Sequence, residues 1–247
     1  MITLTLKEQP SVPLEAETIS PDVCAPLALD QVRALPVFLG KRQLRLDDFF
    51  SVAGAGGEEL ELHGEAGRVK WIGRGMTRGR IRVVGNAGMH LGAYMKGGTI
   101  EVTGNAADWI GAEMRGGLIR IQGNAGGQIG AAYRGSLSGM NGGTIAVKGP
   151  VRDFAGLQMK GGTIILMSGA EIRTGAWMQR GTIVSLAPLR LLPTFGYACS
   201  YNPTFLRVYA KQLLALGFSI PHQTSEGAYR RYTGDTSVPG KGEVLGD

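Results

Sequence analysis

The sequence predicts a mainly β protein: a right-handed parallel β-helix, or solenoid, of about six 19-residue coils, with an N-terminal α/β cap and a C-terminal helix and tail. Two observations predict this fold class. Glycine supplies 40 of the 247 residues, more than twice its usual share of roughly 7%. A 19-residue period runs from residue 60 to residue 187, and a constant period of this length is typical of repeat architectures.

The repeat is visible as identical residue types at a constant spacing. The isoleucine row consists of Ile81, Ile100, Ile119, Ile145, Ile164 and Ile183. The glycine row consists of Gly73, Gly92, Gly111, Gly130, Gly156 and Gly175. The methionine row consists of Met76, Met95, Met114, Tyr133, Met159 and Met178, in which one tyrosine replaces methionine. One longer step in each row predicts a seven-residue insertion around residues 136–140.

Each repeat unit is expected to hold one short strand. Ile81 and Val83 alternate with Arg82, which is the period of two that a strand with one buried face shows. A 19-residue unit is too short for two packed helices, and each glycine in it would cost a helix about 1 kcal/mol. The Leu-x-x-Leu-x-Leu pattern of leucine-rich repeats is absent. Stacked parallel strands at about 4.8 Å therefore remain, with rows of Ile, Val, Leu and Met as a continuous core.

Residues 1–59 are predicted to form an N-terminal cap. Residues 1–6 alternate as a strand does, residues 27–35 have helical spacing, and residues 47–52 fit another helical turn. A solenoid must cover the open edge of its first coil to stay soluble, and this segment is the candidate cover.

The periodicity of residues 60–187 ends at Pro188. Asn202 and Pro203 predict the start of a helix over residues 203–216, closed by Gly217, so residues 188–221 are interpreted as a C-terminal helical cap. Residues 222–247 are polar and have no periodicity, so they are interpreted as an extended tail docked on a partner.

The tail contains the candidate docking arm Tyr229, Arg230, Arg231 and Tyr232. Two tyrosines and two arginines in a segment without a core of its own suit an interface hot spot. A generic flexible end is the alternative.

The positive charge of the chain is concentrated in the repeat. The net charge is +6; residues 60–186 hold 15 basic and 7 acidic residues, whereas residues 1–59 hold 5 and 9. The basic row that follows the methionine position in successive coils consists of Lys96, Arg115, Arg134 and Lys160. Like charges stacked at strand spacing destabilise a fold unless an opposite charge answers them. A solvated edge, an acidic partner surface and an anionic carrier tail are the three explanations.

A second charged row alternates in sign. Arg82, Glu101 and Arg120 occupy one strand position in successive coils, so we expect cross-strand ion pairs among them. Nucleic acid is not expected as a partner, because Trp71, Trp109 and Trp177 do not share a row with the basic residues.

The sequence offers little chemistry for a catalytic or metal site. His63, His90 and His222 have no ligand spacing, and Cys24 and Cys199 lie in unrelated surroundings, so neither metal nor disulfide is expected. Four carboxylates of the repeat fall in three different rows: Glu101, Asp108, Glu113 and Asp153. The glycine-rich loops lack the strand-to-helix junction of a phosphate loop. No catalytic residue is predicted, and no cofactor site can be assigned.

No apolar run approaches the ~18–20 residues of a membrane span, and no secretory signal precedes the chain's first strand. The sequence therefore predicts a soluble, cytoplasmic protein without a membrane partner.

The repeat unit itself resembles a known family. Its pattern is Gly-Asn-Ala-Gly, then x-x-x-Gly-Ala-x-Met, then a basic residue followed by Gly-Gly-x-Ile, as in residues 85–100. This pattern resembles the C subunit of formylmethanofuran dehydrogenase, its relative in the formyltransferase/hydrolase complex of methylotrophic bacteria, and the C-terminal domain of the large glutamate synthase subunit. The resemblance is strong over residues 60–190 and weaker outside them.

The resemblance implies a non-catalytic structural subunit in one-carbon metabolism. Other subunits would move a formyl group from formyl-tetrahydromethanopterin to a methanofuran-type carrier and release formate. It implies formyltransferase, amidohydrolase-like and dehydrogenase-like partner subunits, a hydrolase-site metal on another subunit, and a polyglutamate-type carrier tail near the basic row. Two alternatives stay open: the C subunit of a molybdenum- or tungsten-dependent formylmethanofuran dehydrogenase, and a chain that lends residues to a shared active site.

Overall fold

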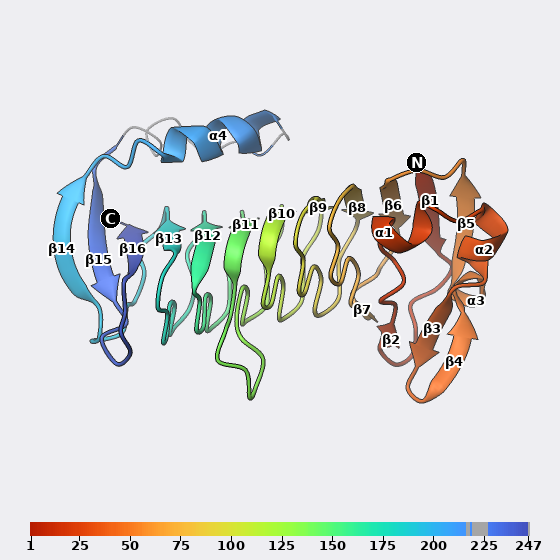
Figure 1. Cartoon of the computed structure of the whole chain (residues 1–247), viewed down its shortest axis with the longest axis horizontal. Coiled ribbons are helices and arrows are strands. Elements are labelled where there is room, and N and C mark those ends of the chain that lie inside the picture. The colour runs from red at the N-terminus through yellow and green to blue at the C-terminus, as the bar shows by residue number, and fades with distance from the viewer. Residues whose placement is uncertain (216–217, 219–226, 247) are drawn as a thin grey trace.

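The chain is mainly β and contains a large mixed sheet. In the computed structural model, residues 1–215, 218 and 227–246 are described. The repeat supplies seven parallel strands to the large sheet. They are β6 (Glu59–His63), β8 (Arg80–Val84), β9 (Thr99–Val102), β10 (Arg115–Ile121), β11 (Asn141–Val147), β12 (Gly161–Leu166) and β13 (Thr182–Ser185). Figure 1 shows these strands side by side along the long axis of the molecule.

The parallel strands pair in the register that the 19-residue period predicts. Ile100 lies opposite both Ile81 and Ile119, and Ile164 lies opposite both Ile145 and Ile183. A second contact line runs through isolated bridges from Ala66 to Ala170, each again one repeat apart. Backbone hydrogen bonds also join successive repeat segments at the corners, where the Gly92 N–H donates to the Ile72 carbonyl at 2.9 Å and the Lys96 N–H donates to the Met76 carbonyl at 2.8 Å. Each segment is therefore held to its neighbour at several places.

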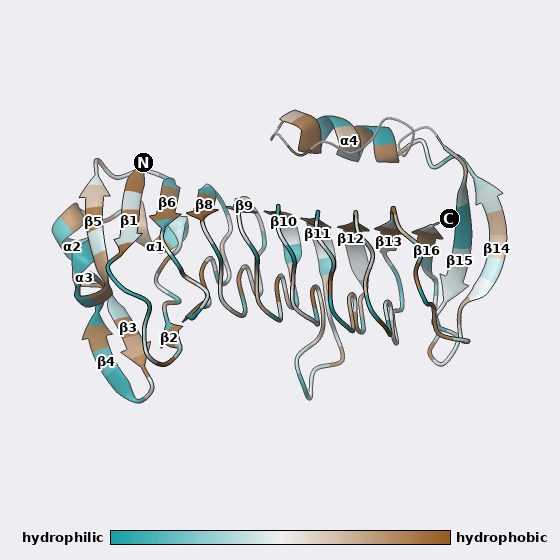
Figure 2. Cartoon of the chain, turned by 180° about the vertical axis from the view of Figure 1, so that it is seen from behind, coloured by the Kyte–Doolittle hydropathy of each residue, from teal (hydrophilic) through white to brown (hydrophobic). Residues whose placement is uncertain are grey.

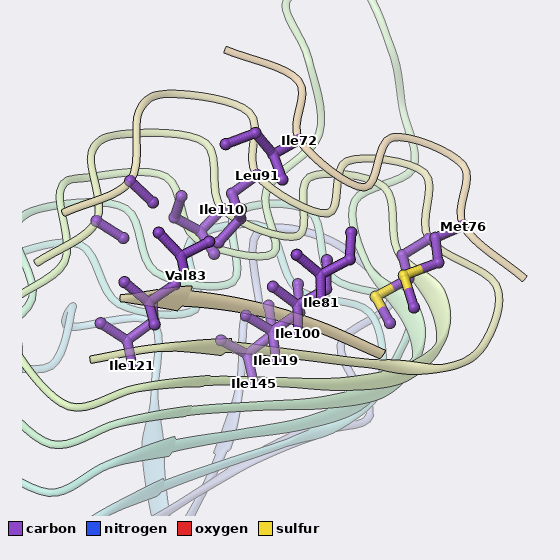
Figure 3. Packing of buried hydrophobic residues seen from close by; sticks show 14 of the residues in the cluster. Ile72, Met76, Ile81, Val83, Leu91, Ile100, Ile110, Ile119, Ile121 and Ile145 are labelled. Atoms are coloured by element: carbon purple, nitrogen blue, oxygen red, sulfur yellow. The ribbon is translucent and has the colours of Figure 1, made fainter. Parts of the chain in front are cut away.

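The inner face of the large sheet, defined as the face that carries Ile81, forms the main core. The six isoleucines of the predicted row are fully buried. Figure 3 shows Ile81, Ile100, Ile119 and Ile145 stacked on one another, with Met76 beside them and Ile72, Leu91 and Ile110 opposite. Stacking identical side chains in this way buries apolar surface continuously along the sheet, at roughly 25 cal/mol per Å² removed from water.

The insertion lies earlier in the chain than the sequence analysis placed it. Met140, not Tyr133, occupies the methionine row: its N–H donates to the Gly130 carbonyl at 2.8 Å, and the next residue, Asn141, donates to the Met114 carbonyl at 2.8 Å. The inserted residues are thus 133–139, which form the loop that projects between β10 and β11 in Figure 1. A buried apolar methionine fits the core better than a phenol, and the fully buried Met140 satisfies that requirement.

The N-terminal segment extends the sheet and adds a small second one. Its elements are β1 (Ile2–Leu6), β2 (Leu14–Glu15), α1 (Pro21–Cys24), α2 (Leu29–Arg33), β3 (Pro36–Leu39), β4 (Arg42–Arg45), α3 (Leu46–Phe49) and β5 (Phe50–Gly54). Strand β1 pairs in parallel with β6 and antiparallel with β5, whereas β7 (Val69–Lys70) joins β2, β3 and β4 in the second sheet. The predicted first strand and a helix within residues 27–35 are confirmed. The expected helical turn at 47–52 is only half correct, because β5 begins at Phe50.

The C-terminal segment closes the other end of the sheet. It contains β14 (Gly196–Tyr201), α4 (Leu206–Ala215), β15 (Tyr229–Gly234) and β16 (Gly242–Gly246), and β16 pairs in parallel with β13. Helix α4 begins at Leu206, three residues later than predicted, and residues 216 and 217 lie outside the described residues. Figures 1 and 2 show α4 running alongside β10–β13, with hydrophobic and hydrophilic residues alternating along it.

Helix α4 covers part of the outer face, defined as the face that carries Arg82. Its Leu206 and Leu213 pack with Ala146, Ile165 and Val184 of the sheet, in a cluster separate from the main core. The Tyr209 hydroxyl lies 2.9 Å from the Thr163 hydroxyl of β12. Among the described helices, none is long and apolar enough to cross a membrane.

The glycine row is required by close packing, and a pair of glycines tests this. Gly92 and Gly40 share a φ of +63°, but a Cβ at Gly92 would lie 2.5 Å from Ile119 Cδ1, whereas one at Gly40 meets nothing within 4 Å. We expect Gly92→Ala to lower the free energy of unfolding by about 1–3 kcal/mol more than Gly40→Ala, because only the first overpacks the core. Chemical denaturation of both variants measures the difference. Equal losses would refute the packing role.

Candidate functional site

The basic row is shorter and more interrupted than the sequence suggested. The backbone N–H of each row member donates to the carbonyl of the methionine one repeat earlier. The residues that make this contact are Lys96, Arg115, Asn141, Lys160 and Gln179. Arg134 is not among them, because it lies in the inserted loop; the prediction that it shares the row is wrong. The physical cause is the position of the insertion, which carries Arg134 out of the stack.

The remaining cations of the row have no internal counter-charge among the described residues. Lys96 and Arg115 are exposed, Lys160 is half-buried, and none of the ion pairs within the described part of the chain includes them. A surface hollow of about 420 Å³ beside Lys160 is also lined by Arg180 and Lys241. This side of the repeat therefore presents a cationic surface from Lys96 to Lys241, interrupted by polar amides.

The predicted docking arm is part of the sheet. Tyr229, Arg230, Arg231 and Tyr232 lie in β15, which pairs antiparallel with both β14 and β16. Tyr229 is buried in the cluster beneath α4, and the Arg231 Nε donates to the Glu243 carboxylate at 2.6 Å, a contact that raises the pKa of Arg231. Of these four residues only Arg230 is exposed. The interpretation of residues 222–247 as an extended tail without a core is thus corrected for the described residues 227–246: apolar residues among the polar ones give β15 and β16 a core with α4.

An aromatic cluster, which the sequence analysis did not identify, covers the corners of three repeat segments. Trp71, His90 and Trp109 are 19 residues apart and stack, with ring centroids 4.2 Å apart for the first pair and 6.4 Å for the second. Tyr133 from the inserted loop contacts all three rings and places its hydroxyl 2.9 Å from His90 Nδ1. Arg74 lies over Trp71 at 5.4 Å. The equal spacing of these residues was a signal in the sequence; the contribution of Tyr133 depended on locating the insertion.

The aromatic cluster keeps His90 neutral. Burial and the nearby Lys70 charge lower the pKa of His90 to about 4, although Asp108 opposes the shift. Burial likewise raises the pKa of Tyr133, so its hydroxyl stays protonated. Tyr133 and His90 can therefore share a neutral hydrogen bond that fastens the inserted loop to the repeat.

The outer face of β6, β8, β9 and β10 carries a network of ion pairs. Buried Glu101 accepts from Arg120 at 2.6 Å and also pairs with Arg80, whereas Arg82 pairs with Glu61 at 3.2 Å. The predicted Glu101–Arg120 pair is confirmed; Arg82 pairs with the preceding strand instead of with Glu101. These side chains line a cleft of about 320 Å³.

The other carboxylates of the repeat hold the backbone in place. Asp108 accepts from the Gly127 N–H at 2.8 Å, and Glu113 accepts from the Tyr133 N–H at 3.2 Å. Neither is paired with a second carboxylate in the described structure. Within the described residues no three His, Cys, Asp or Glu side chains are grouped to hold a metal ion, and His222 lies outside those residues.

Comparisons with known proteins identify relatives of this chain. No protein-family model matches the sequence. Over 97 residues, 37% of this chain, it is 42% identical to the C subunit of the tungsten-containing formylmethanofuran dehydrogenase 2 of Methanothermobacter thermautotrophicus. Over 95 residues it is 38% identical to the C subunit of the molybdenum-containing formylmethanofuran dehydrogenase 1 of Methanosarcina barkeri. These matches span about a third of each relative's length, 36% and 32%.

One solved structure matches this chain over nearly the whole length of both chains. It is a chain of the formyltransferase/hydrolase complex from Methylorubrum extorquens in complex with methylofuran, with a TM-score of 0.82, 30% identity, and coverage of 99% of this chain and 98% of that one. The chain belongs to the family of the formylmethanofuran dehydrogenase C subunits. Among the described residues, the exposed cations Lys96, Arg115 and Arg230 have no ion pair, so the cationic surface and the exposed Arg230 are the candidate contact sites.

The cationic surface can be tested for a structural role by charge reversal. Lys96→Glu combined with Arg115→Glu should change the free energy of unfolding by less than about 0.5 kcal/mol, because both side chains are exposed and unpaired. Arg120→Glu is the matched control and should cost about 3 kcal/mol or more, because it leaves Glu101 buried beside a like charge. Urea denaturation distinguishes them. A large loss in the double variant would show that the row stabilises the fold.

The neutral state of His90 predicts a pH dependence. Its folded pKa lies below the unfolded value, so the stability it contributes is complete above about pH 6.5 and is lost as the pH falls toward about 4. Between about pH 7.5 and pH 5 the wild type should lose more stability than His90→Gln. The full pKa shift corresponds to about 2 kcal/mol over this range, and solvent screening of the half-buried ring reduces the loss to roughly 1 kcal/mol, a difference of about 2–4 °C in Tm. Identical pH profiles in thermal melting would contradict the buried, neutral histidine.

Proposed function

We propose that this chain is a non-catalytic structural subunit of a formyltransferase/hydrolase complex. The observation that carries the proposal is the match over 99% of the chain to a chain of such a complex. In the proposed complex a formyl group moves from formyl-tetrahydromethanopterin to a methanofuran-type carrier and is released as formate, in the cytoplasm. The carboxylates of the repeat are engaged with backbone amides and arginines, which fits a chain that supplies surface rather than acid or base groups.

The catalytic groups and cofactors of the proposed complex belong to other subunits. A formyltransferase subunit, an amidohydrolase-like subunit with the hydrolase-site metal, and a dehydrogenase-like subunit are the proposed partners. This chain itself would hold no cofactor, and nucleic acid and membrane are not proposed as partners.

The fold suits this role. We describe the stacked repeat segments as coils of a right-handed parallel β-helix, because short connections between in-register parallel strands follow a right-handed path in nearly all known cases. The proposed division is an N-terminal cap (1–59), the β-helix (60–187), a helical cap (188–221) and a terminal segment (222–247). Such a rod is extended and rigid, and can therefore hold partners at fixed separation.

The cationic surface is the proposed contact for an anionic partner. Lys96, Arg115 and Lys160 project from it without ion pairs among the described residues, so an acidic surface of another subunit or a polyglutamate-type carrier tail would satisfy them. Arg134 lies on the inserted loop and would meet a partner there instead of in the row. A solvated edge remains the simplest alternative.

A second candidate function is that of the C subunit in a molybdenum- or tungsten-containing formylmethanofuran dehydrogenase. The names of the curated relatives, at 38–42% identity over about a third of their length, favour it. The third possibility is a chain that lends residues to an active site shared with its partners. It is disfavoured because Glu101, Asp108 and Glu113 already accept hydrogen bonds from an arginine or from backbone amides.

Purification of the tagged chain from its native cell separates these functions. The first function predicts co-elution of formyltransferase and amidohydrolase-like subunits, release of formate from formyl-tetrahydromethanopterin, and no molybdenum or tungsten by elemental analysis. Iron–sulfur subunits together with either metal would establish the dehydrogenase. A chain that elutes alone would contradict both.

A further inference from the structure

The two edge strands of the large sheet differ in whether other groups occupy their free backbone hydrogen-bonding atoms. Strand β5 is one edge strand and β14 the other in the described part of the sheet. At β5 the Arg33 guanidinium of α2 donates to the Val52 carbonyl at 3.0 Å, so side-chain contacts occupy that edge. The backbone hydrogen bonds of β14 that join described residues run to β15 alone. Figure 1 shows β14 as the outermost strand at its end of the molecule.

Strand β14 is also open on both faces. Five of its six residues are exposed and the sixth is half-buried; Tyr197 is 60% exposed. The strand contains no charged residue and no proline, the residues with which proteins normally protect a free edge. Its register against β15 shifts once, between Tyr197 and Cys199, which leaves residues 199–201 as a regular paired stretch. Such an edge offers unpaired backbone groups to another strand.

The charge around β14 indicates what kind of strand would pair with it. The strand beside β14 carries two cations, because Arg230 of β15 lies opposite Ser200 and Arg231 lies opposite Cys199. The described residues beyond 187 include two acidic side chains. Both acidic groups are occupied: buried Asp235 accepts from the Trp177 N–H at 2.9 Å, and Glu243 accepts from Arg231 and from Thr182. Arg230 is exposed and has no ion pair among the described residues, whereas Arg231 is paired with Glu243. These two arginines form the cationic frame of β14.

We propose that β14 is the docking edge for an extended acidic segment of a partner subunit, which adds to the large sheet as a further strand. Backbone hydrogen bonds along the edge would provide affinity, and the cationic frame would select a negatively charged segment. A second copy of this chain is disfavoured as the occupant, because pairing two β14 edges would bring two cationic frames together. The inference rests on the proposed role of the chain as a docking subunit.

Cys199 at the centre of β14 supplies a built-in probe. It is exposed, whereas Cys24, the other cysteine of the sequence, is buried, and burial raises the pKa of the Cys24 thiol. Iodoacetamide should therefore alkylate Cys199 selectively in the free chain. In the assembly purified from the native cell, we expect alkylation of Cys199 to slow at least about tenfold, with parallel slowing of amide hydrogen exchange at residues 199–201.

Three variants test whether the edge itself binds. Cys199→Glu places a negative charge on the edge and should reduce recovery of the partner at least about tenfold, as a like charge would repel an acidic strand. Cys199→Ser keeps the edge neutral, and Ser51→Glu places the same charge on an exposed position of β5; both should recover the partner as the wild type does. Circular dichroism melting confirms that each variant folds.

The outcomes separate this inference from the proposed function. Formyl-transferring subunits that co-purify while Cys199 reacts at its free rate would overturn the inference alone, as would normal assembly of Cys199→Glu or protection of β14 in a dimer of this chain. Protection of β14 by an acidic segment of a protein unrelated to formyl transfer would support the inference and contradict the proposed function. Elution of the chain alone would overturn both.

Discussion

The structure depends on one constraint: every repeat segment must present the same backbone to the next one in register. Backbone hydrogen bonds at the strand, at the bridge line from Ala66 to Ala170 and at the basic row fix that register at several places in each segment. The isoleucine and methionine rows then stack on identical neighbours and fill the interior. The corners must be glycine where an isoleucine from the next segment occupies the space that a Cβ would need, as at Gly92. A one-residue slip would move every row to the wrong face.

Because the interior is the same in every segment, differences between segments appear on the outside. On the outer face the row that contains Glu61, Arg82, Glu101 and Arg120 continues as Ala146, Ile165 and Val184. In the charged half, Glu61 and Glu101 pair with arginines, although the Nε atoms of Arg80 and Arg120 and one further Arg120 nitrogen are buried without a hydrogen-bond partner. The apolar half is covered by α4. Within the described residues, Lys96, Arg115 and Lys160 have no ion pair, and β14 pairs through its backbone with β15 alone.

The sequence predicted the interior well and the surface poorly, for a physical reason. A core row repeats because its environment repeats, so Ile81 to Ile183 could be placed by spacing alone. Surface features come from departures from the period. Tyr133 resembled a core residue because it stands 19 residues after Met114, yet the loop of residues 133–139 moves it to the aromatic cluster. Arg134 was misplaced for the same reason. The polar composition of residues 227–246 hid two strands, because a buried Tyr229 and Leu245 suffice to anchor them against α4.

These features fit the proposed role of a chain that contributes position and contact surface to an assembly. Family membership rests on the full-length structural match and agrees with the repeat pattern in the sequence. Within the described residues, Glu101 pairs with Arg120, and Asp108 and Glu113 accept from backbone amides, so these carboxylates serve the fold. The cations of the row and the β14 edge are the contacts proposed for partners.

The claim that the chain docks without catalysing is tested most directly by titrating it into its catalytic partner subunits and following formate release. For a docking subunit, reversal of Lys96 and Arg115 should raise the concentration of chain needed for half-maximal rate, while the rate at saturation stays that of the wild type. A lower rate at saturation, with unchanged half-maximal concentration, would show that this chain contributes to the chemical step and would contradict the account.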